Sequence, residues 1–295
     1  MSSVRKSTVS GMFYDADQTM LEEQIKNCFF SDFGPGSLPT IKEKDQQIKG
    51  LIVPHAGYLF SGAIAAHSYH ALAISGFADV FIILGPNHQG NGPAVALSSI
   101  GSWKTPLGET PVDEELTKTL SKGICSIDDA IMNQRENSIE VQLPFLQFIA
   151  KNHPFSIVPM SISHQDKETA EKLGTDLSKA LIEEDRSVVL IASTDFSHEG
   201  ISYGRMPPSG QPVNEYVRAQ DQYAIENINK MNPDGLIDAV YHHQISMCGF
   251  GPVASILHAA KNTGGTSVEL LKYGSSYDVH PDPTACVGYA SFVIS

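Results

Sequence analysis

Short apolar runs bounded by glycine, proline and polar turn residues recur along the whole chain. Several are rich in Val and Ile without alternating polar positions, which is typical of strands covered on both faces. The pattern predicts strands over residues 48–54, 80–85, 94–98, 155–161, 187–193, 268–273 and 286–294.

Between these runs, apolar residues recur at spacings of three and four, the period of a helix that buries one face. This spacing predicts helices over residues 20–30, 61–72, 114–122, 138–151, 167–183, 215–230 and 252–261. Ser61 and Asp113 are suited to cap the second and third of them. Strands that alternate with helices are typical of a parallel sheet with helices on both faces.

We therefore expect one α/β domain over residues 1–295, with three α/β/α layers around a central mixed, largely parallel sheet. The sheet is expected to be mixed because the last two predicted strands have no helical pattern between them.

Three of the predicted strands lead into a turn that carries a histidine. His55 follows the first strand, His88 the second, and His198 comes five residues after the strand over 187–193. In open α/β sheets, ligands bind outside the carboxyl ends of the strands. Three imidazoles at one edge predict a metal site or an acid–base site, although a single histidine in a loop more often only hydrogen-bonds a carbonyl.

Two further residues extend this prediction. Asp195 stands three residues before His198, where its carboxylate could orient the imidazole or simply cap a turn. Cys248 lies in a glycine-rich turn before the helix over 252–261, and a helix N-terminus favours a thiolate. The alternative for Cys248 is a packed, unreactive thiol.

Other polar residues stand near these turns in the sequence, and we expect Tyr58, Asn87, Glu140 and His243 beside the ligands or in contact with substrate. Asn137 or Ser138 could instead begin a helix, with the neighbouring acids complementing its N-terminal dipole.

The composition of the chain limits the kinds of partner that we expect it to bind. The net charge is −13 and no Lys/Arg cluster forms a stripe, so nucleic acid and anionic membrane surfaces are not expected partners. No apolar run approaches the ~20 residues that span a bilayer, and residues 1–7 lack the core of a secretory signal, so we expect a cytoplasmic protein. The four cysteines are scattered, which argues against a disulfide framework and a zinc finger.

The motifs, taken together and in order, resemble the Memo family. They are Pro54-His55-Ala56-Gly57-Tyr58, Leu84-Gly85-Pro86-Asn87-His88, Glu136-Asn137-Ser138-Ile139-Glu140 with the following Val141-Gln142-Leu143-Pro144, Ser193-Thr194-Asp195-Phe196-Ser197-His198, Cys248-Gly249, and an opening Gly11-Met12-Phe13-Tyr14. The resemblance covers essentially the whole chain.

This resemblance implies a fold similar to the LigB-like class III extradiol dioxygenases, which hold non-haem iron with two histidines and a glutamate and open catechol rings with O₂. In the Memo family the corresponding ligands are two histidines and a cysteine, which places them at His55, His88 and Cys248 here. His198 then resembles the acid–base histidine of the dioxygenases. A thiolate in place of a carboxylate is softer and favours zinc, copper or iron in another electronic state.

Three functions follow as hypotheses. The first is a metal-dependent oxidoreductase that uses one divalent transition metal (iron, copper or zinc), with His198 moving a proton and Asp195 orienting it. The second is a protein that binds a metal, a small molecule or a peptide in the same cleft without turnover. The third, which has less support, is a hydrolase that uses a metal-bound water.

Overall fold

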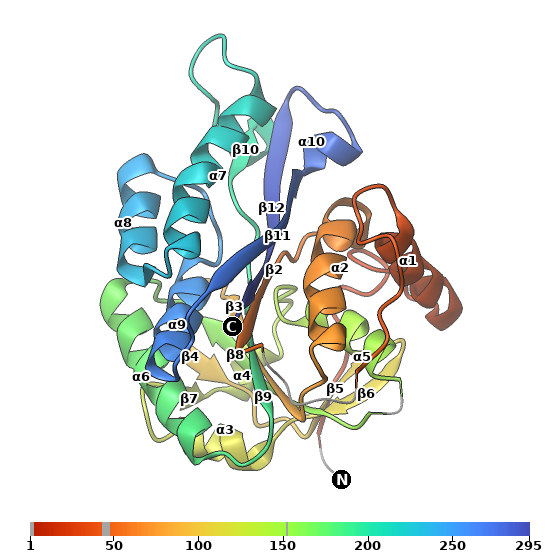
Figure 1. Ribbon diagram of the computed structural model, residues 1–295, viewed down its shortest axis with the longest axis vertical. Coiled ribbons are helices and arrows are strands. Elements are labelled where there is room, and N and C mark those ends of the chain that lie inside the picture. The colour runs from red at the N-terminus through yellow and green to blue at the C-terminus, as the bar shows by residue number, and fades with distance from the viewer. Residues whose placement is uncertain (1–2, 43–47, 152) are drawn as a thin grey trace.

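The computed structural model describes residues 3–42, 48–151 and 153–295 (Figure 1). Two sheets form within these residues. The large sheet contains β2 (Gly50–Val53), β3 (Val80–Pro86), β4 (Val95–Leu97), β7 (Ser126–Ile127), β8 (Ser156–Ile162), β9 (Val188–Ser193), β10 (His198–Gly200), β11 (Val268–Ser275) and β12 (Ala285–Ile294). The small one contains β1 (Val4–Arg5), β5 (Ser102–Thr105) and β6 (Gly108–Pro111).

The large sheet runs in the order β10-β12-β2-β9-β3-β8-β4-β7, and β11 pairs with β12. Its four central strands, β2, β9, β3 and β8, are parallel. All seven predicted strands are present, with ends shifted by at most two residues. The mixed α/β sheet is confirmed, but four of its eight strand pairings are antiparallel, so it is less parallel than predicted.

Helices cover both faces of the sheet (Figure 1). One face packs against α1 (Gln18–Phe30), α2 (Tyr58–Ile74) and α5 (Leu143–Ala150), and the other against α6 (Lys167–Glu183), α7 (Val213–Asn229), α8 (Pro233–His243) and α9 (Phe250–Asn262). The strands divide their side chains between the two layers: Leu51 and Val53 join the first core, and Ile52 joins the second. Burial on both faces explains why these strands are apolar throughout.

Some predicted helix ends are wrong. Asp113 caps α3 (Glu114–Leu120) by accepting from Leu116 N, as predicted. However, α2 begins at Tyr58, so Ser61 lies inside the helix and its hydroxyl donates to the carbonyl of Ala56. The helix expected over residues 138–151 begins only with η1 (Glu140–Gln142) and α5. A short helix, α10 (Ser276–Val279), separates the last two strands.

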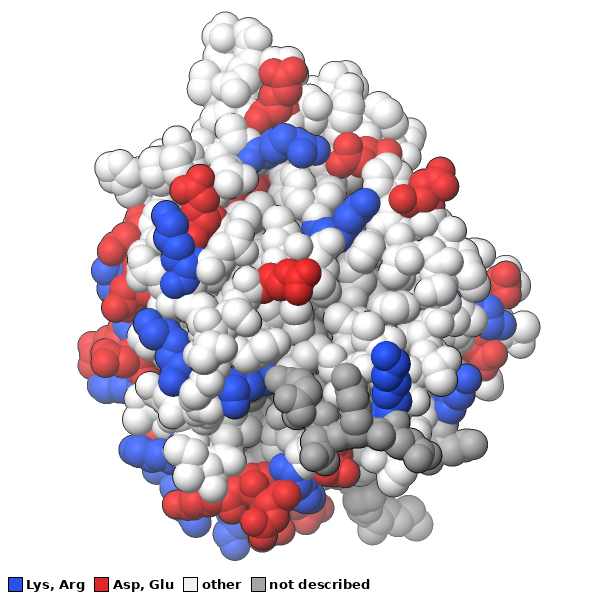
Figure 2. All heavy atoms as spheres, in the orientation of Figure 1, with Lys and Arg blue, Asp and Glu red and all other residues white. Residues whose placement is uncertain are grey.

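Two further short segments complete the described chain: α4 (Asp129–Met132) and η2 (Ile201–Tyr203). Among the described helices, none is both long and apolar enough to cross a membrane. On the face shown in Figure 2, the Lys and Arg side chains of the described residues stand among Asp and Glu side chains rather than in a continuous stripe.

The strand order brings the candidate residues to one edge of the sheet. β9 lies between β2 and β3, with Val53 opposite Ser193 and Leu84 opposite Ala192. These three strands are parallel, so the turns that follow Val53, Pro86 and Ser193 emerge side by side.

Candidate metal centre

His55 lies immediately beyond β2, where Pro54 lacks the N–H that would continue the strand pairing. Its side chain is buried, and its Nδ1 lies 3.0 Å from Ser193 Oγ. The single hydroxyl proton of Ser193 goes to the carbonyl of Ser138, while Gln142 Nε2 donates to the same Oγ at 2.7 Å. Ser193 Oγ can therefore only accept from His55, so Nδ1 carries the proton and Nε2 keeps its lone pair.

Burial also keeps the His55 ring neutral. It lowers the pKa of His55 to about 4, against the opposing effect of the nearby Asp195 and Glu136 carboxylates. A neutral imidazole with a fixed Nδ1 proton is the form in which histidine binds a metal through Nε2.

His88 is oriented by a carboxylate. Asn87 shapes its turn by accepting from the N–H groups of Gln89 and Gly90, and so acts on the backbone. His88 Nδ1 donates to Glu136 Oε1 at 2.9 Å, and the His88 N–H donates to Oε2 at 2.8 Å. Because an ionised carboxylate only accepts, Nδ1 carries the proton here too and Nε2 is left free.

The Glu136–His88 pair changes the pKa of both partners. Burial opposes ionisation of Glu136, but the hydrogen bonds from His88 and Ser138 outweigh it and lower the Glu136 pKa to about 2. Burial alone would lower the pKa of His88, yet the contact with Glu136 raises it. The carboxylate is therefore charged at neutral pH and holds the ring in one orientation.

Cys248 reaches the two histidines from the turn before α9. Its Sγ lies 3.2 Å from His55 Nε2 and accepts from Asp195 N–H at 3.2 Å. His55, His88 and Cys248 form a group whose ligand atoms all lie within 4.8 Å of one another. Burial, and next the charge of Asp195, raise the pKa of Cys248, so the free protein holds a neutral thiol.

The turn that carries Cys248 is fixed on both sides. Gln165 binds the Cys248 carbonyl at 2.8 Å through its amide nitrogen and the Gly251 N–H at 2.8 Å through its amide oxygen. Gly249 N–H donates to Thr194 Oγ1 at 2.9 Å. A Cβ on Gly249 would lie 2.7 Å from the Ser193 carbonyl oxygen, so only glycine allows this close approach.

The donor set fits a transition-metal ion. Two imidazole Nε2 atoms have their lone pairs fixed by the hydrogen bonds at Nδ1, and the third donor is sulfur. Nitrogen and thiolate ligands at such spacing suit zinc, copper or iron rather than magnesium or calcium, which prefer oxygen. Three protein ligands leave further coordination positions open.

His198 is linked through Ser246 to the turn that carries Cys248, since Ser246 stands two residues before that cysteine. Its Nδ1 lies 3.1 Å from the Ser246 carbonyl oxygen, which only accepts, so Nδ1 carries the proton and Nε2 is unprotonated in the neutral ring. Ser246 Oγ also accepts from the His198 N–H at 2.7 Å, and the ring packs edge-on against Tyr203.

The expectation that Asp195 orients His198 is wrong. Asp195 Oδ1 accepts from the N–H groups of His55 at 2.7 Å and Ala56 at 3.2 Å, so this carboxylate fixes the His55 turn. The residue that orients His198 is Ser246, 48 positions away in the sequence.

The remaining expected neighbours serve other parts of the fold. The buried hydroxyl of Tyr58 donates to the Val141 carbonyl at 2.6 Å, and His243 stacks on Tyr223 at the end of α8. The Glu140 carboxylate pairs with Arg5 at 2.7 Å. Among the described residues, these three side chains make no hydrogen bond to His55, His88 or Cys248.

Sequence reasoning missed the residues that fix the candidate ligands, namely Glu136, Ser193, Gln142 and Gln165, and the residue that orients His198, Ser246. Glu136, Gln142 and Ser193 stand inside the quoted motifs, so their positions were visible but their roles were not. Gln165 and Ser246 carry no local signal.

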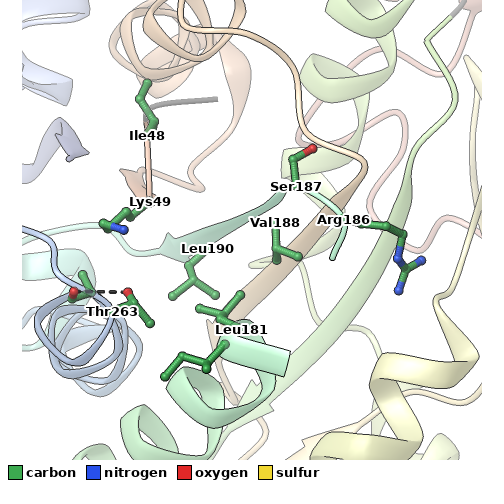
Figure 3. Close-up of a pocket in the computed structure, with 10 residues that line it drawn as sticks. Ile48, Lys49, Leu181, Arg186, Ser187, Val188, Leu190 and Thr263 are labelled. Atoms are coloured by element: carbon green, nitrogen blue, oxygen red, sulfur yellow. Dashed lines mark hydrogen bonds between the residues drawn. The ribbon is translucent and has the colours of Figure 1, made fainter. Parts of the chain in front are cut away.

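A pocket of about 330 Å³ lies at the opposite, amino-terminal ends of the parallel strands, between Lys49 and Val188 (Figure 3). Two of its polar side chains are engaged elsewhere: Arg186 pairs with Asp113 and Glu184, and the Thr263 hydroxyl donates to α9 carbonyls. Within the part of the chain that the structure describes, its lining holds no group of His, Cys, Asp and Glu side chains like the one at the carboxyl ends.

Known proteins are similar to this chain over nearly its whole length. A family model described as "Memo-like protein" matches residues 5–293. A MEMO1 family protein of Methanopyrus kandleri is 40% identical, covering 98% of each chain, and one of Methanothermobacter thermautotrophicus is 38% identical, covering 97% of this chain and 99% of that one. An uncharacterized protein of Escherichia coli K12 shares the fold, with a TM-score of 0.55 at 12% identity over 84% of this chain and 100% of that one.

Proposed function

We propose that this chain, which belongs to the Memo family, binds one divalent transition-metal ion through His55, His88 and Cys248 and uses it in oxidoreductase chemistry. The observation that carries the proposal is the pair of fixed imidazole tautomers. Ser193 and Glu136 each accept an Nδ1 proton, so both Nε2 lone pairs are available beside the Cys248 sulfur.

The residues around the ligands support a metal rather than a purely structural cluster. A hydrogen-bonded partner behind each histidine is the usual arrangement in metal sites, where it fixes the ring and raises its basicity. When bound, the ion supplies Lewis acidity and, for iron or copper, redox chemistry.

His198 is the proposed proton carrier. Its Nδ1–H is held by Ser246, so Nε2 is the atom that takes a proton from a bound small molecule and returns it. Tyr203 packs against the ring and limits its rotation. Asp195 acts indirectly, since its carboxylate fixes the turn of His55 and its N–H supports the Cys248 sulfur.

Metal analysis tests the proposal. The protein is purified without oxygen and reconstituted in turn with Fe(II), Cu and Zn, alongside Cys248→Ser and the control Cys125→Ser, a buried thiol outside the site. One equivalent of metal in the wild type and the control, with a clear loss in Cys248→Ser, supports the site. No stoichiometric metal in the wild type overturns it.

Oxygen consumption then separates the two main roles. The loaded protein is supplied with catechols and other small reductants, and dissolved O₂ is followed. Turnover that depends on His198 supports the oxidoreductase. Stoichiometric metal without any turnover favours the alternative, a binding protein whose cleft holds a metal, a small molecule or a peptide.

A further inference from the structure

Arg5 is a buried cation far from the metal ligands in the sequence. It ends β1, is 2% exposed, and its guanidinium lies 3.9 Å from the centre of the Trp103 ring. One nitrogen, Nη1, pairs with Glu140 Oε2 at 2.7 Å. A buried pair of this kind is costly to form unless the remaining donors and acceptors are also satisfied.

The other donors of Arg5 reach mainly the main chain of a single segment. Nε donates to the Met132 carbonyl at 2.8 Å, and Nη2 contacts the carbonyls of Gln134 at 3.4 Å and Glu136 at 3.3 Å, as well as the Thr8 hydroxyl at 3.4 Å. Met132 ends α4, and Gln134 and Glu136 follow it outside any strand, so no strand pairing fixes the backbone of this segment. The planar guanidinium, which has five donors in a fixed geometry, instead binds the backbone carbonyls of this segment.

This segment ends at the carboxylate that orients His88. Glu136 has its carbonyl held by Arg5 and its side chain bound to both nitrogens that His88 offers, the ring Nδ1 and the main-chain N–H. A shift of the Glu136 backbone therefore moves the partner of the ring. The His55 ring has a different partner, since its Nδ1 lies 3.0 Å from Ser193 Oγ, which also accepts from Gln142 Nε2 and donates to the Ser138 carbonyl.

We infer that Arg5 is a positioning residue of the metal centre, which sets the place of Glu136 and through it the direction of His88 Nε2. The inference rests on the proposed metal function. Among the described residues, the guanidinium makes no hydrogen bond to His55, His88 or Cys248, and its link to His88 runs through the segment from Met132 to Glu136. The amino-terminal strand is thus a working part of the site.

The test is a titration with Co(II), whose visible absorption reports both binding and the sulfur ligand. The central variant is Arg5→Met combined with Glu140→Gln, so that no carboxylate is left buried without its partner, and it is compared with Glu140→Gln alone. Tyr14→Phe is the matched control, because it removes a bond to Glu140 without touching the segment from Met132 to Glu136. Each of these variants is also combined with Glu136→Gln, which removes the carboxylate through which Arg5 is inferred to act.

We expect Glu136→Gln to weaken Co(II) binding about 10- to 100-fold. Arg5→Met should weaken binding about tenfold or more relative to Glu140→Gln, and should add almost nothing once Glu136→Gln is present. The sulfur-to-cobalt absorption should persist in every variant, and Tyr14→Phe should bind as the wild type does.

If Arg5→Met lowers Co(II) affinity equally in proteins that carry Glu136 and in those that carry Glu136→Gln, or does not lower it at all, the positioning role is overturned while the metal site stands. Failure of the wild type to bind Co(II) overturns the metal site and the inference with it. If the variant that combines Arg5→Met with Glu140→Gln does not fold, Arg5→Lys takes its place, because it keeps a cation beside Glu140 but cannot span three carbonyls. It should likewise weaken Co(II) binding when Glu136 is present and add almost nothing once Glu136→Gln is present.

Discussion

The sulfur of Cys248 lies 3.2 Å from Nε2 of His55, although 193 positions separate the two residues in the sequence. Both are held by the same short segment: Asp195 binds the His55 main chain through its side chain and the Cys248 sulfur through its N–H. The carboxyl end of β9 is therefore the element that brings the two ligands together.

Replacing Cys248 by serine should lower metal affinity more than tenfold for zinc and copper, because a hydroxyl is a harder and less readily ionised ligand than a thiol. Equilibrium dialysis followed by elemental analysis measures the change. Cys125→Ser, on a buried residue outside the site, should keep one equivalent. Equal retention of metal by Cys248→Ser and the wild type would show that the sulfur is not a ligand.

Replacing His198 by glutamine should leave metal content unchanged and reduce any turnover by about 10²- to 10⁴-fold, the usual contribution of a positioned acid–base group. Oxygen uptake and metal analysis are measured on the same sample. His243→Gln is the control, since that ring stacks on Tyr223 away from the ligands. Loss of the metal in His198→Gln would instead make His198 a ligand.

Replacing Ser193 by alanine should weaken metal binding about tenfold, because His55 Nδ1–H and the Gln142 amide both lose their acceptor. In the metal-free protein, ¹⁵N spectra of the imidazole should show mixed tautomers for His55. Ser178→Ala, which removes a hydroxyl that donates within α6, serves as the control. A single unchanged His55 tautomer would contradict the argument.

The buried carboxyl of Asp221 should make the free energy of unfolding depend on pH. This fully buried carboxyl accepts from Ser197 N–H at 2.8 Å and the Tyr273 hydroxyl at 2.7 Å, yet burial raises its pKa to about 6, above the usual 3.8. The folded state therefore binds the proton more tightly than the unfolded state. The stabilising contribution is complete below about pH 4 and is lost as the pH rises through 6.

The change amounts to about 3 kcal/mol, since each pKa unit is worth about 1.4 kcal/mol. Asp221→Asn stays neutral, so the stability of the wild type relative to this variant should fall by that amount between pH 4 and pH 7. Urea unfolding at a series of pH values measures both proteins, and the contributions of other titrating groups cancel in the difference. Parallel curves would show that Asp221 is already ionised at pH 4.

The sequence predicted the strands and the histidine turns because their signals are local. A Val- and Ile-rich run followed by proline or glycine marks both the strand and its end, and His55 and His88 stand within two residues of those ends. The parallel order of β2, β9 and β3 then brings the two turns together.

The partners of those histidines could not be predicted in the same way. Asp195 is three positions from His198, but its carboxylate faces the His55 turn, and the partner of His198 comes from Ser246. The helix expected from Ser138 begins later because this segment is bound elsewhere. The Glu136 carboxylate accepts from His88, the Ser138 hydroxyl donates to the Pro86 carbonyl, and the Ser138 carbonyl accepts from Ser193. Distance in sequence does not show the direction of a side chain once tertiary contacts compete for it.

The separation of His55 and Cys248 along the chain also means that the proposed metal site would couple metal supply to folding. An unfolded chain does not hold the two residues together, so an ion bound by both would bind tightly only to the folded state and shift the folding equilibrium by mass action. A metal concentration 100 times the dissociation constant adds about 2.7 kcal/mol to stability. That is a large share of the roughly 5–15 kcal/mol that keeps a typical domain folded. Scarcity of the metal would then shorten the lifetime of the protein as well as stop its chemistry.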